Sequence, residues 1–276
     1  NAIVVVGSLS EPERLDPLLR AWGVSAKAVE GRWEAFRICE ASRNGERALF
    51  VVGSDPRGTA YGVLELSRLL GVSPWEWWAD VTPRRSRTVT LTAGYDRTEA
   101  PSVQYRGIFL NDEDWGLTPW ASQTFEPERG NIGPRTYAKV CELLLRLKAN
   151  YLAPAMHPVS TSFNQIPENK LVADTFAIVM GSTHCEPLLL NTASEWDTQT
   201  MGPWNYDKNK EGINRVLTQR VRENSPYENV YTLALRGLLE QRILKLGDRV
   251  VRQRLHRDGL GREAVEQPRE VADNAG

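Results

Sequence analysis

A short apolar run near the middle of the chain leads straight into a cluster of acidic side chains. The run IFL at 108–110 is followed by NDED at 111–114 and by Trp115. This pattern predicts a buried strand whose carboxyl end is crowded with carboxylates. In a barrel of alternating strands and helices, substrates bind and reactions take place at that end. Asp112 is our best candidate for a pocket carboxylate, and its alternative role is an N-cap or a loop ion pair.

The residues that follow Asp112 are weaker candidates. Glu113 and Asp114 are adjacent in the chain and point elsewhere, so we expect them to be mainly structural, with Glu113 as a secondary substrate-binding candidate. Indole faces pack well against sugar rings, but they also pack well in protein cores. Four tryptophans lie in loops on the same predicted face, and core packing is the alternative explanation for at least half of them: Trp115, Trp120, Trp196 and Trp204.

Polar residues also follow two later predicted strands. His184 lies just past the third strand, and Arg236 ends the fourth. Cys185 beside His184 suggests a thiol nucleophile, but neighbours on a strand face opposite sides, which argues against a catalytic pair. Glu186 has the same parity as His184 and could orient its ring. The alternatives are a packed or surface histidine and, for Arg236, an ordinary ion pair.

The composition excludes several classes of protein. Hydrophobic residues make up 41% and charged residues 25% of the 276 residues, and the net charge is −1. This balance gives no electrostatic argument for nucleic acid or an anionic membrane as a partner, and no apolar stretch reaches the ~20 residues of a membrane span. Three scattered cysteines predict neither a disulfide framework nor a zinc module. No nucleotide, metal or calcium motif is present, so we expect no cofactor and no metal.

The first hundred residues predict a small α/β domain over 1–100. Asn44-Gly45 is a strong hairpin signal, and Asp55 is expected to cap a helix that has Pro56 at its first position. The domain shows no catalytic constellation, so we expect it to be structural. Strands are predicted at 2–6 (buried), 35–40, 48–52 and 88–92, and helices at 12–22 and 56–70.

Residues 101–237 are predicted to alternate strands with helices. Each strand ends in polar residues, which favours βα units in a parallel sheet. A closed barrel needs eight such units, and only four are present. The predicted fold class is therefore α/β, with a small N-terminal domain followed by the first half of a (β/α)8 barrel. Beyond the opening strand, strands are predicted at 151–156, 177–181 and 229–235, and helices from Pro134, around 171–176 and at 207–223.

Five long segments carry a resemblance to a known family. They are GTAYGVLELSRLLGVSPWEWWADV, YRGIFLNDEDWGLTPWA, FNQIPENKLVADTFAIVMGSTHCEPLL, GPWNYDKNKEGI and YENVYTLALRG, which together run over roughly the first 237 residues. They resemble glycoside hydrolase family 115, the xylan α-1,2-glucuronidases. The layout of a small α/β domain before a barrel also resembles the family 20 hexosaminidases.

The resemblance implies an enzyme that removes glucuronic acid, or its 4-O-methyl ether, from glucuronoxylan with inversion. Such a reaction needs an acid and a base carboxyl group ~6.5–9.5 Å apart. The carboxylate of the substrate calls for cationic or hydrogen-bonding partners. The family match implies a sugar contact for His184 and for Asp112, while Arg236 could pair with the substrate carboxylate. It also implies glucuronoxylan or acidic xylo-oligosaccharides as partners, a possible homodimer in the full-length family, and an extracellular or periplasmic location.

The chain departs from the family pattern in its length and after Gly237. Family members are several times longer, and the sequence changes at 238 to LLEQRILKLGDRVVRQRL and a charged tail. We expect the tail, 238–276, to begin helical and to fray past Gly259. We expect the chain to be a truncated or frame-altered product that lacks the general acid. Two hypotheses follow: an α-glucuronidase or its amino-terminal portion, and a non-catalytic remnant that binds acidic sugar weakly.

Overall fold

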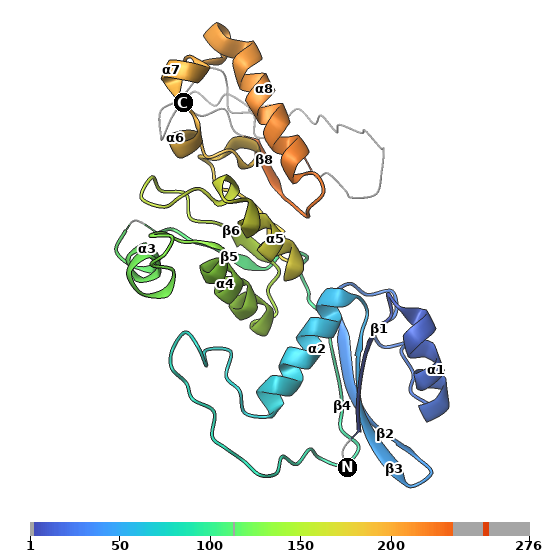
Figure 1. Cartoon of the computed structure of the whole chain (residues 1–276). Coiled ribbons are helices and arrows are strands. Elements are labelled where there is room, and N and C mark those ends of the chain that lie inside the picture. Colours follow the sequence, from blue (N-terminus) through green and yellow to red (C-terminus); the bar gives the residue numbers. More distant parts are fainter. Residues whose placement is uncertain (1–2, 113, 234–250, 254–276) are drawn as a thin grey trace, which may run out of the picture. The chain divides into compact units, whose positions relative to one another are not determined.

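The structure is a computed structural model that describes residues 3–112, 114–233 and 251–253 (Figure 1). Its architecture is mixed α/β, and the chain divides into two compact units, residues 1–181 and 182–276. None of the helices in the described ranges is both long and apolar enough to cross a membrane.

The first unit begins with a four-stranded sheet in the order β1-β3-β2-β4. β1 runs parallel to β3, while β2 is antiparallel to both β3 and β4. Asn44 and Gly45 both have left-handed backbone angles, with φ of 50° and 84°, and place Arg43 opposite Glu46. This is the geometry that a two-residue hairpin turn requires, so the predicted hairpin is confirmed. The strands are β1 (Ile3–Ser8), β2 (Phe36–Arg43), β3 (Glu46–Gly53) and β4 (Asp96–Glu99).

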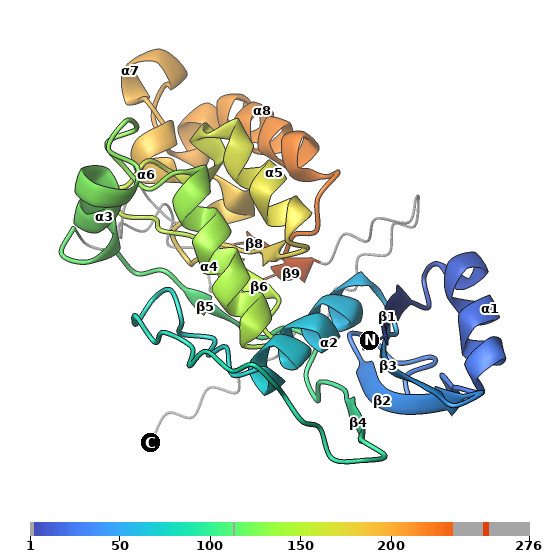
Figure 2. The ribbon, with the colours of Figure 1, turned by 60° about the horizontal axis from the view of Figure 1, so that its bottom comes forward.

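Helices α1 (Pro12–Trp22) and α2 (Pro56–Leu69) cover opposite faces of this sheet (Figures 1 and 2). Side chains of β3 alternate accordingly, because Phe50 packs in the cluster beneath α1 and Val51 in the cluster beneath α2. The Asp55 carboxylate accepts the N–H of Gly58 at 2.8 Å and caps α2, as the sequence predicts.

Two predictions for this domain are wrong in detail. β1 is a sheet edge that pairs with β3 alone among the described residues, and its outer valines, Val4 and Val6, are exposed rather than buried. Residues 88–92 form no strand, although Thr-Val-Thr-Leu-Thr has a high β propensity. These side chains are almost all exposed, so they have no buried face to offer a sheet. The fourth strand is instead β4.

The second sheet of this unit has three parallel strands in the order β5-β6-β7. Between them run α4 (Pro134–Arg146) and α5 (Pro167–Thr175), which pack side by side in both ribbon views (Figures 1 and 2). Three of the predicted strands and the two helices that connect them are thereby confirmed. The strands are β5 (Gly107–Phe109), β6 (Tyr151–Ala153) and β7 (Val179–Met180); the short elements are α3 (Leu117–Trp120), η1 (Ala121–Phe125) and η2 (Phe163–Gln165).

β5 is not the buried strand that the sequence predicts. Ile108 and Phe109 are 42% and 41% exposed. The physical reason is its position, because within the described residues β5 pairs with β6 alone and forms the edge of the sheet. An apolar run therefore identifies the strand correctly, but says nothing about what covers it.

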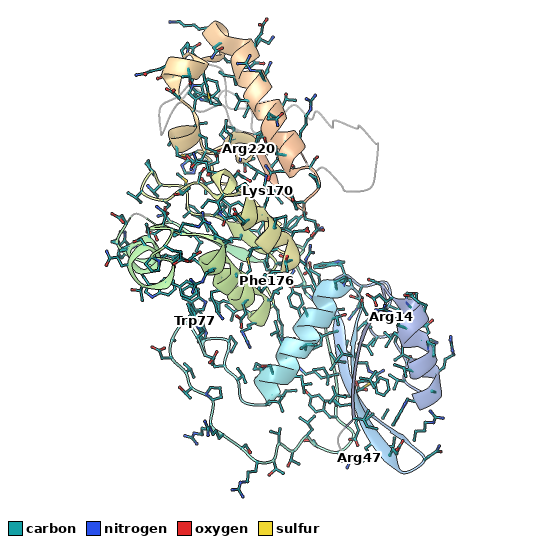
Figure 3. The ribbon with its side chains drawn as sticks, in the orientation of Figure 1. Arg14, Arg47, Trp77, Lys170, Phe176 and Arg220 are labelled. Atoms are coloured by element: carbon teal, nitrogen blue, oxygen red, sulfur yellow. The ribbon has the colours of Figure 1, made fainter. Side chains whose placement is uncertain are left out.

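One apolar core joins the two sheets of the first unit. Val51 and Tyr61 pack in the same cluster as Leu144 of α4 and Leu152 of β6, and the Tyr61 hydroxyl donates to the carbonyl of Ala149 at 3.1 Å. Half-buried aromatic rings form a second contact around Trp77, which is labelled in Figure 3. The rings in contact with it are those of Trp78, Trp120 and Phe125, and the Lys139 ammonium lies 5.1 Å from its centroid.

The second unit is built around α8 (Tyr206–Asn224), which matches the helix predicted at 207–223. Its core contains Trp196 and Trp204, whose rings meet edge to face at 4.7 Å. β8 (Tyr231–Leu233) lies within the strand predicted at 229–235, but its ladder is antiparallel, with β9 (Val251–Gln253), instead of parallel. The apolar pattern predicts a strand and does not specify its partner. The short elements are η3 (Pro187–Leu189), α6 (Thr192–Glu195) and α7 (Thr198–Met201).

Candidate functional site

The loop that follows β5 is folded around the Asp112 carboxylate. Oδ1 accepts the N–H of Asp114 at 2.9 Å, and Oδ2 accepts the N–H of Thr118, the second residue of α3. The group is buried, and these backbone donors satisfy both of its oxygens. Asp112 thus organises its own loop through backbone hydrogen bonds, rather than through the N-cap or loop ion pair that the sequence analysis gives as its alternative role. The same contacts fix the position of its carboxylate at the end of β5.

This loop presents one of the four candidate tryptophans to solvent. Trp115 lies between the two donors that Asp112 binds and is 82% exposed. Trp120 packs in the half-buried cluster around Trp77, and Trp196 and Trp204 are buried in the core of the second unit. Trp115 is therefore the candidate whose face is open to a ligand.

A histidine that the sequence analysis does not single out, His157, lies at the same edge of the parallel sheet. His157, four residues past the end of β6, lies with Nε2 3.2 Å from Oδ1 of Asn111, two residues past the end of β5. The ladder continues between the two strands beyond their bounds, because the N–H of Leu110 donates to the carbonyl of Ala153 at 2.9 Å. Parallel strands deliver their carboxyl ends to one edge, which is the signal that could have identified His157.

The loops at this edge are tied to each other by buried polar contacts. The hydroxyls of Thr118 and Ser160 lie 2.9 Å apart, and both residues are buried. Asn131 binds the loop after β6 twice, since its Oδ1 accepts the N–H of Thr161 at 3.0 Å and its Nδ2 donates to the carbonyl of Val159 at 3.1 Å. The edge is therefore a connected polar surface, in which Asn111 and Trp115 are exposed and His157 is partly so.

In the second unit, His184 and Glu186 do not share a face as their parity predicts. His184 is exposed and Glu186 is buried. The alternation argument fails because residues 182–186 lie past the end of β7 and form turns rather than a strand. Oε1 of Glu186 accepts from Nδ2 of Asn191 at 3.1 Å, and Oε2 has no hydrogen-bond partner among the described residues. No hydrogen bond joins Glu186 to the His184 ring among the described residues.

Burial raises the pKa of Glu186 from 4.5 to about 7, while hydrogen bonds from Thr183 and Asn191 oppose the rise. Two charged groups act on it less strongly: Glu195 raises the pKa, and Arg220 lowers it. Those two form a buried ion pair with each other, between α6 and α8, and Arg220 is labelled in Figure 3. Glu186 is therefore a carboxyl group that the fold keeps largely protonated below neutral pH.

This property predicts a pH-dependent stability. In the folded state Glu186 retains a proton that the unfolded chain releases near pH 4.5. Its contribution to the free energy of unfolding is therefore complete below that pH and is lost as the pH rises to about 7. At about 1.4 kcal/mol per pH unit, the loss is roughly 3 kcal/mol. Glu186→Gln, which is always neutral, should match the wild type at pH 4.5 and exceed it at pH 8. Urea unfolding of the two proteins at both pH values measures this, with the exposed Glu211→Gln as a control; a pH-independent difference would contradict it.

Comparison with known proteins identifies the family. The sequence model of glycosyl hydrolase family 115 matches residues 98–259, more than half of the 276-residue chain. The chain belongs to glycosyl hydrolase family 115. The family 115 match continues past Gly237, the point at which the sequence predicts that the resemblance ends.

A solved structure supports the same assignment for this family 115 chain. It is that of a family 115 4-O-methyl-α-glucuronidase with specificity for decorated arabinogalactans, which is 42% identical, with a TM-score of 0.80. The match covers 89% of this chain and 32% of that chain, so the family 115 chain spans about a third of the length of the solved protein. No curated protein matches the chain.

The remaining predicted residues of the family 115 chain are distributed as follows. Asp112 and Trp115 belong to the first unit, and His184 and Glu186 to the second. Glu113 and Arg236 lie outside the described residues, as does most of the tail predicted at 238–276. Within the described ranges, no group of three His, Cys, Asp or Glu side chains could hold a metal ion.

Proposed function

We propose that this chain contributes the sugar-binding part of a glycosidase that removes glucuronic acid, or its 4-O-methyl ether, from decorated glycans. One observation carries the proposal. At the carboxyl ends of β5 and β6, an exposed indole, an Asn–His pair and a buried carboxylate lie along one edge of a parallel sheet in a family 115 chain. Indole faces stack on sugar rings, and the amide and imidazole supply donors and acceptors for hydroxyl groups.

We assign roles to the candidate residues from this arrangement. Asp112 holds the loop and directs a lone pair at a sugar hydroxyl or at the attacking water. Trp115 supplies a stacking surface, with Glu113 as a secondary polar contact beside it. From the family resemblance, His184 contacts the sugar and Arg236 pairs with the substrate carboxylate, for which a guanidinium is the suitable partner. Glu186 holds the segment that carries His184.

The proposed mechanism is inversion at the anomeric carbon. It needs one carboxyl group that protonates the leaving oxygen and one carboxylate that activates water. We assign no residue of this chain to the first role, so we expect binding without hydrolysis from this polypeptide alone. The exposed edge of β5 supports the idea of an incomplete (β/α)8 barrel, because a closed barrel covers both sides of every strand.

The substrate class follows from the family and from the similar protein. We propose a uronic acid side chain on a polysaccharide, with glucuronoxylan as our first choice and a decorated arabinogalactan as the second, since the latter is what the similar solved protein acts on. An enzyme of polymeric substrates works outside the cell or in the periplasm, and we propose that location. We also propose that the full-length family protein is a homodimer.

The test combines a binding assay with a release assay on the purified chain. Calorimetric titration with an acidic xylo-oligosaccharide that carries 4-O-methylglucuronic acid should show saturable binding, and the same oligosaccharide without the uronic acid should bind at least tenfold more weakly. Chromatography after prolonged incubation with glucuronoxylan should show no free 4-O-methylglucuronic acid above a blank. Equal binding of both oligosaccharides would contradict the sugar specificity, and released acid would contradict the binding-only role.

A further inference from the structure

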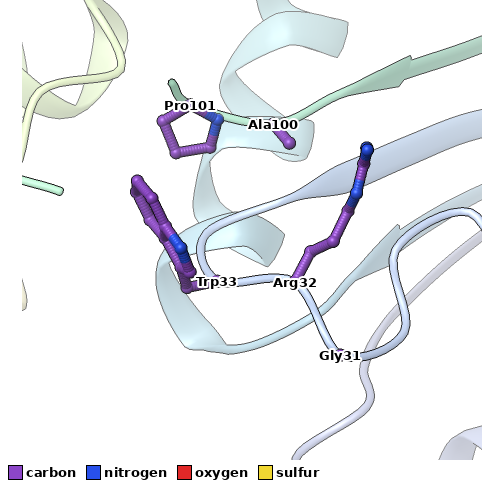
Figure 4. Close-up of a pocket in the computed structure, with 5 residues that line it drawn as sticks. All are labelled: Gly31, Arg32, Trp33, Ala100 and Pro101. Carbon is purple, nitrogen blue, oxygen red and sulfur yellow. The ribbon is translucent and has the colours of Figure 1, made fainter. Parts of the chain in front are cut away.

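A hollow lies at one end of the first sheet, near the start of β2 and the end of β4. β2 and β4 pair antiparallel with Phe36 opposite Glu99, so the chain just before Phe36 and just after Glu99 emerges at the same end. There the segment 31–33 faces the segment 100–101 around a volume of about 320 Å³ (Figure 4). This volume is within the range of small-ligand pockets in proteins, ~300–1,000 Å³.

The hollow is lined by an exposed indole whose backbone is firmly held. Trp33 is 44% exposed, and in Figure 4 its ring stands opposite the ring of Pro101. The next residue, Glu34, has a left-handed φ of 52°, and its N–H donates to the Asp55 carboxylate. The Glu34 side chain is itself bound by Arg57, with Nη1 at 2.7 Å from Oε1. A ring whose attachment point is fixed in this way loses little freedom when a ligand stacks on it.

A cation stands beside this indole. The Arg32 side chain borders the same hollow (Figure 4) and is exposed. In the part of the chain that the structure describes, no carboxylate forms an ion pair with Arg32. Arg57 and Arg106, by contrast, both form ion pairs with Glu34. A flat apolar surface next to an uncompensated guanidinium is complementary to a pyranose ring that carries a carboxylate.

We propose that this hollow is a second carbohydrate site, which binds a uronic acid residue of the polysaccharide by stacking on Trp33 and pairing with Arg32. Pro101 forms the opposite wall and Gly31 the open floor. The choice of a uronic acid over other ring-bearing anions rests on the proposed function. The site would hold an acidic polysaccharide on the small domain, separately from the residues at the ends of β5 and β6.

Affinity electrophoresis of the full chain in gels that contain 4-O-methylglucuronoxylan tests the proposal. Trp33→Ala should weaken binding about 10- to 100-fold, because it removes most of the buried apolar contact. Arg32→Gln should weaken binding of the acidic polymer roughly threefold and leave binding of unsubstituted xylan unchanged. Trp33→Phe keeps a stacking surface and should stay within about threefold of the wild type. Trp75→Ala, a change at an equally exposed indole outside the hollow, should have no effect.

Wild-type retention by Trp33→Ala would overturn the proposal, as would a loss of affinity in Trp75→Ala that matches it. If Trp33→Ala fails to fold, the variants Trp33→Phe and Arg32→Gln still test the proposal. If Trp33 had only a structural role, Arg32→Gln would not change the preference for the acidic polymer over unsubstituted xylan. A failure of this proposal can be distinguished from a failure of the proposed function with a variant at the sheet edge. His157→Ala should abolish binding of a uronic acid monosaccharide at the sheet edge and leave the Trp33-dependent retention of the polymer in place.

Discussion

Replacing Glu34 with alanine is expected to lower the free energy of unfolding by about 3–5 kcal/mol. The Glu34 carboxylate is 5% exposed and binds three groups. Its Oε1 accepts from Arg57 Nη1 and from Asn150 Nδ2, both at 2.7 Å, and its Oε2 accepts from Arg106. Removing the carboxylate leaves two largely buried guanidinium groups without their shared anion. Such uncompensated charge is what makes breaking a buried ion pair costly.

The Glu34 network also links the two sheets of the first unit. Glu34 precedes β2, Arg57 is the second residue of α2, and Arg106 and Asn150 stand immediately before β5 and β6. Arg106 reaches further, since its Nε donates to the carbonyl of Lys148 at 2.8 Å. A carboxylate just before β2 therefore holds the starts of two strands of the parallel sheet.

Urea unfolding followed by circular dichroism measures the effect of Glu34→Ala. Glu11→Ala is the matched control, because Glu11 pairs with Arg14 at 3.0 Å on an exposed surface. Surface pairs contribute little, so its unfolding midpoint should not change measurably. Glu34→Gln, which keeps the shape and can still accept from Asn150, should lie between the wild type and Glu34→Ala. Equal midpoints for Glu34→Ala and Glu11→Ala would show that the network does not stabilise the fold.

Replacing Glu126 with alanine is expected to cost about 3 kcal/mol or more. Glu126 is buried beneath the start of α4 and accepts the backbone N–H groups of Gly133 at 3.0 Å, Arg135 at 3.0 Å and Thr136 at 2.8 Å, as well as the Thr136 hydroxyl. It thus serves as a remote cap for a helix whose own N-cap, Gly133, has no side chain. Alanine would leave several buried donors without a partner. Each unsatisfied donor costs about 1–3 kcal/mol of folding free energy before the surrounding structure relaxes.

Glu128 provides the control for this variant, two residues along the same loop. It is exposed, and its carboxylate pairs with the Arg135 side chain at 3.0 Å. Glu128→Ala should leave thermal unfolding unchanged, whereas Glu126→Ala should lower the midpoint by several degrees. Loss of helix signal at the same temperature in both variants would mean that α4 does not depend on the buried carboxylate.

Local signals in the sequence predict many elements of the first unit correctly. Asn44-Gly45 predicts the hairpin and Asp55 predicts the start of α2, because both act through contacts within a few residues. Exposure is predicted less well. Ile108 and Phe109 lie on a sheet edge, and Thr-Val-Thr-Leu-Thr at 88–92 lies outside any sheet, since both outcomes depend on partners elsewhere in the chain.

The candidate site shows the same division. Asp112 and Trp115 can be chosen as candidates from the sequence, because they lie in the short segment that follows an apolar run. His157 could not be chosen in this way, because its contact with Asn111 depends on the register of β5 against β6. The parity of His184 and Glu186 misleads, since it presumes a strand where the chain forms turns. Glu126 and Glu34 bind distant backbone and side-chain groups, for which the sequence carries no local signal.

The most direct test of the central claim is a titration of the purified chain with methyl α-D-glucuronide, followed by the imidazole NMR signals of its three histidines. Assignment comes from His157→Ala and His184→Ala. We predict a saturable shift of the His157 signal, and no shift with methyl α-D-xyloside, which has no carboxylate. An unchanged His157 signal at saturating glucuronide, or an equal shift with the xyloside, would contradict a uronic acid site at the end of this parallel sheet.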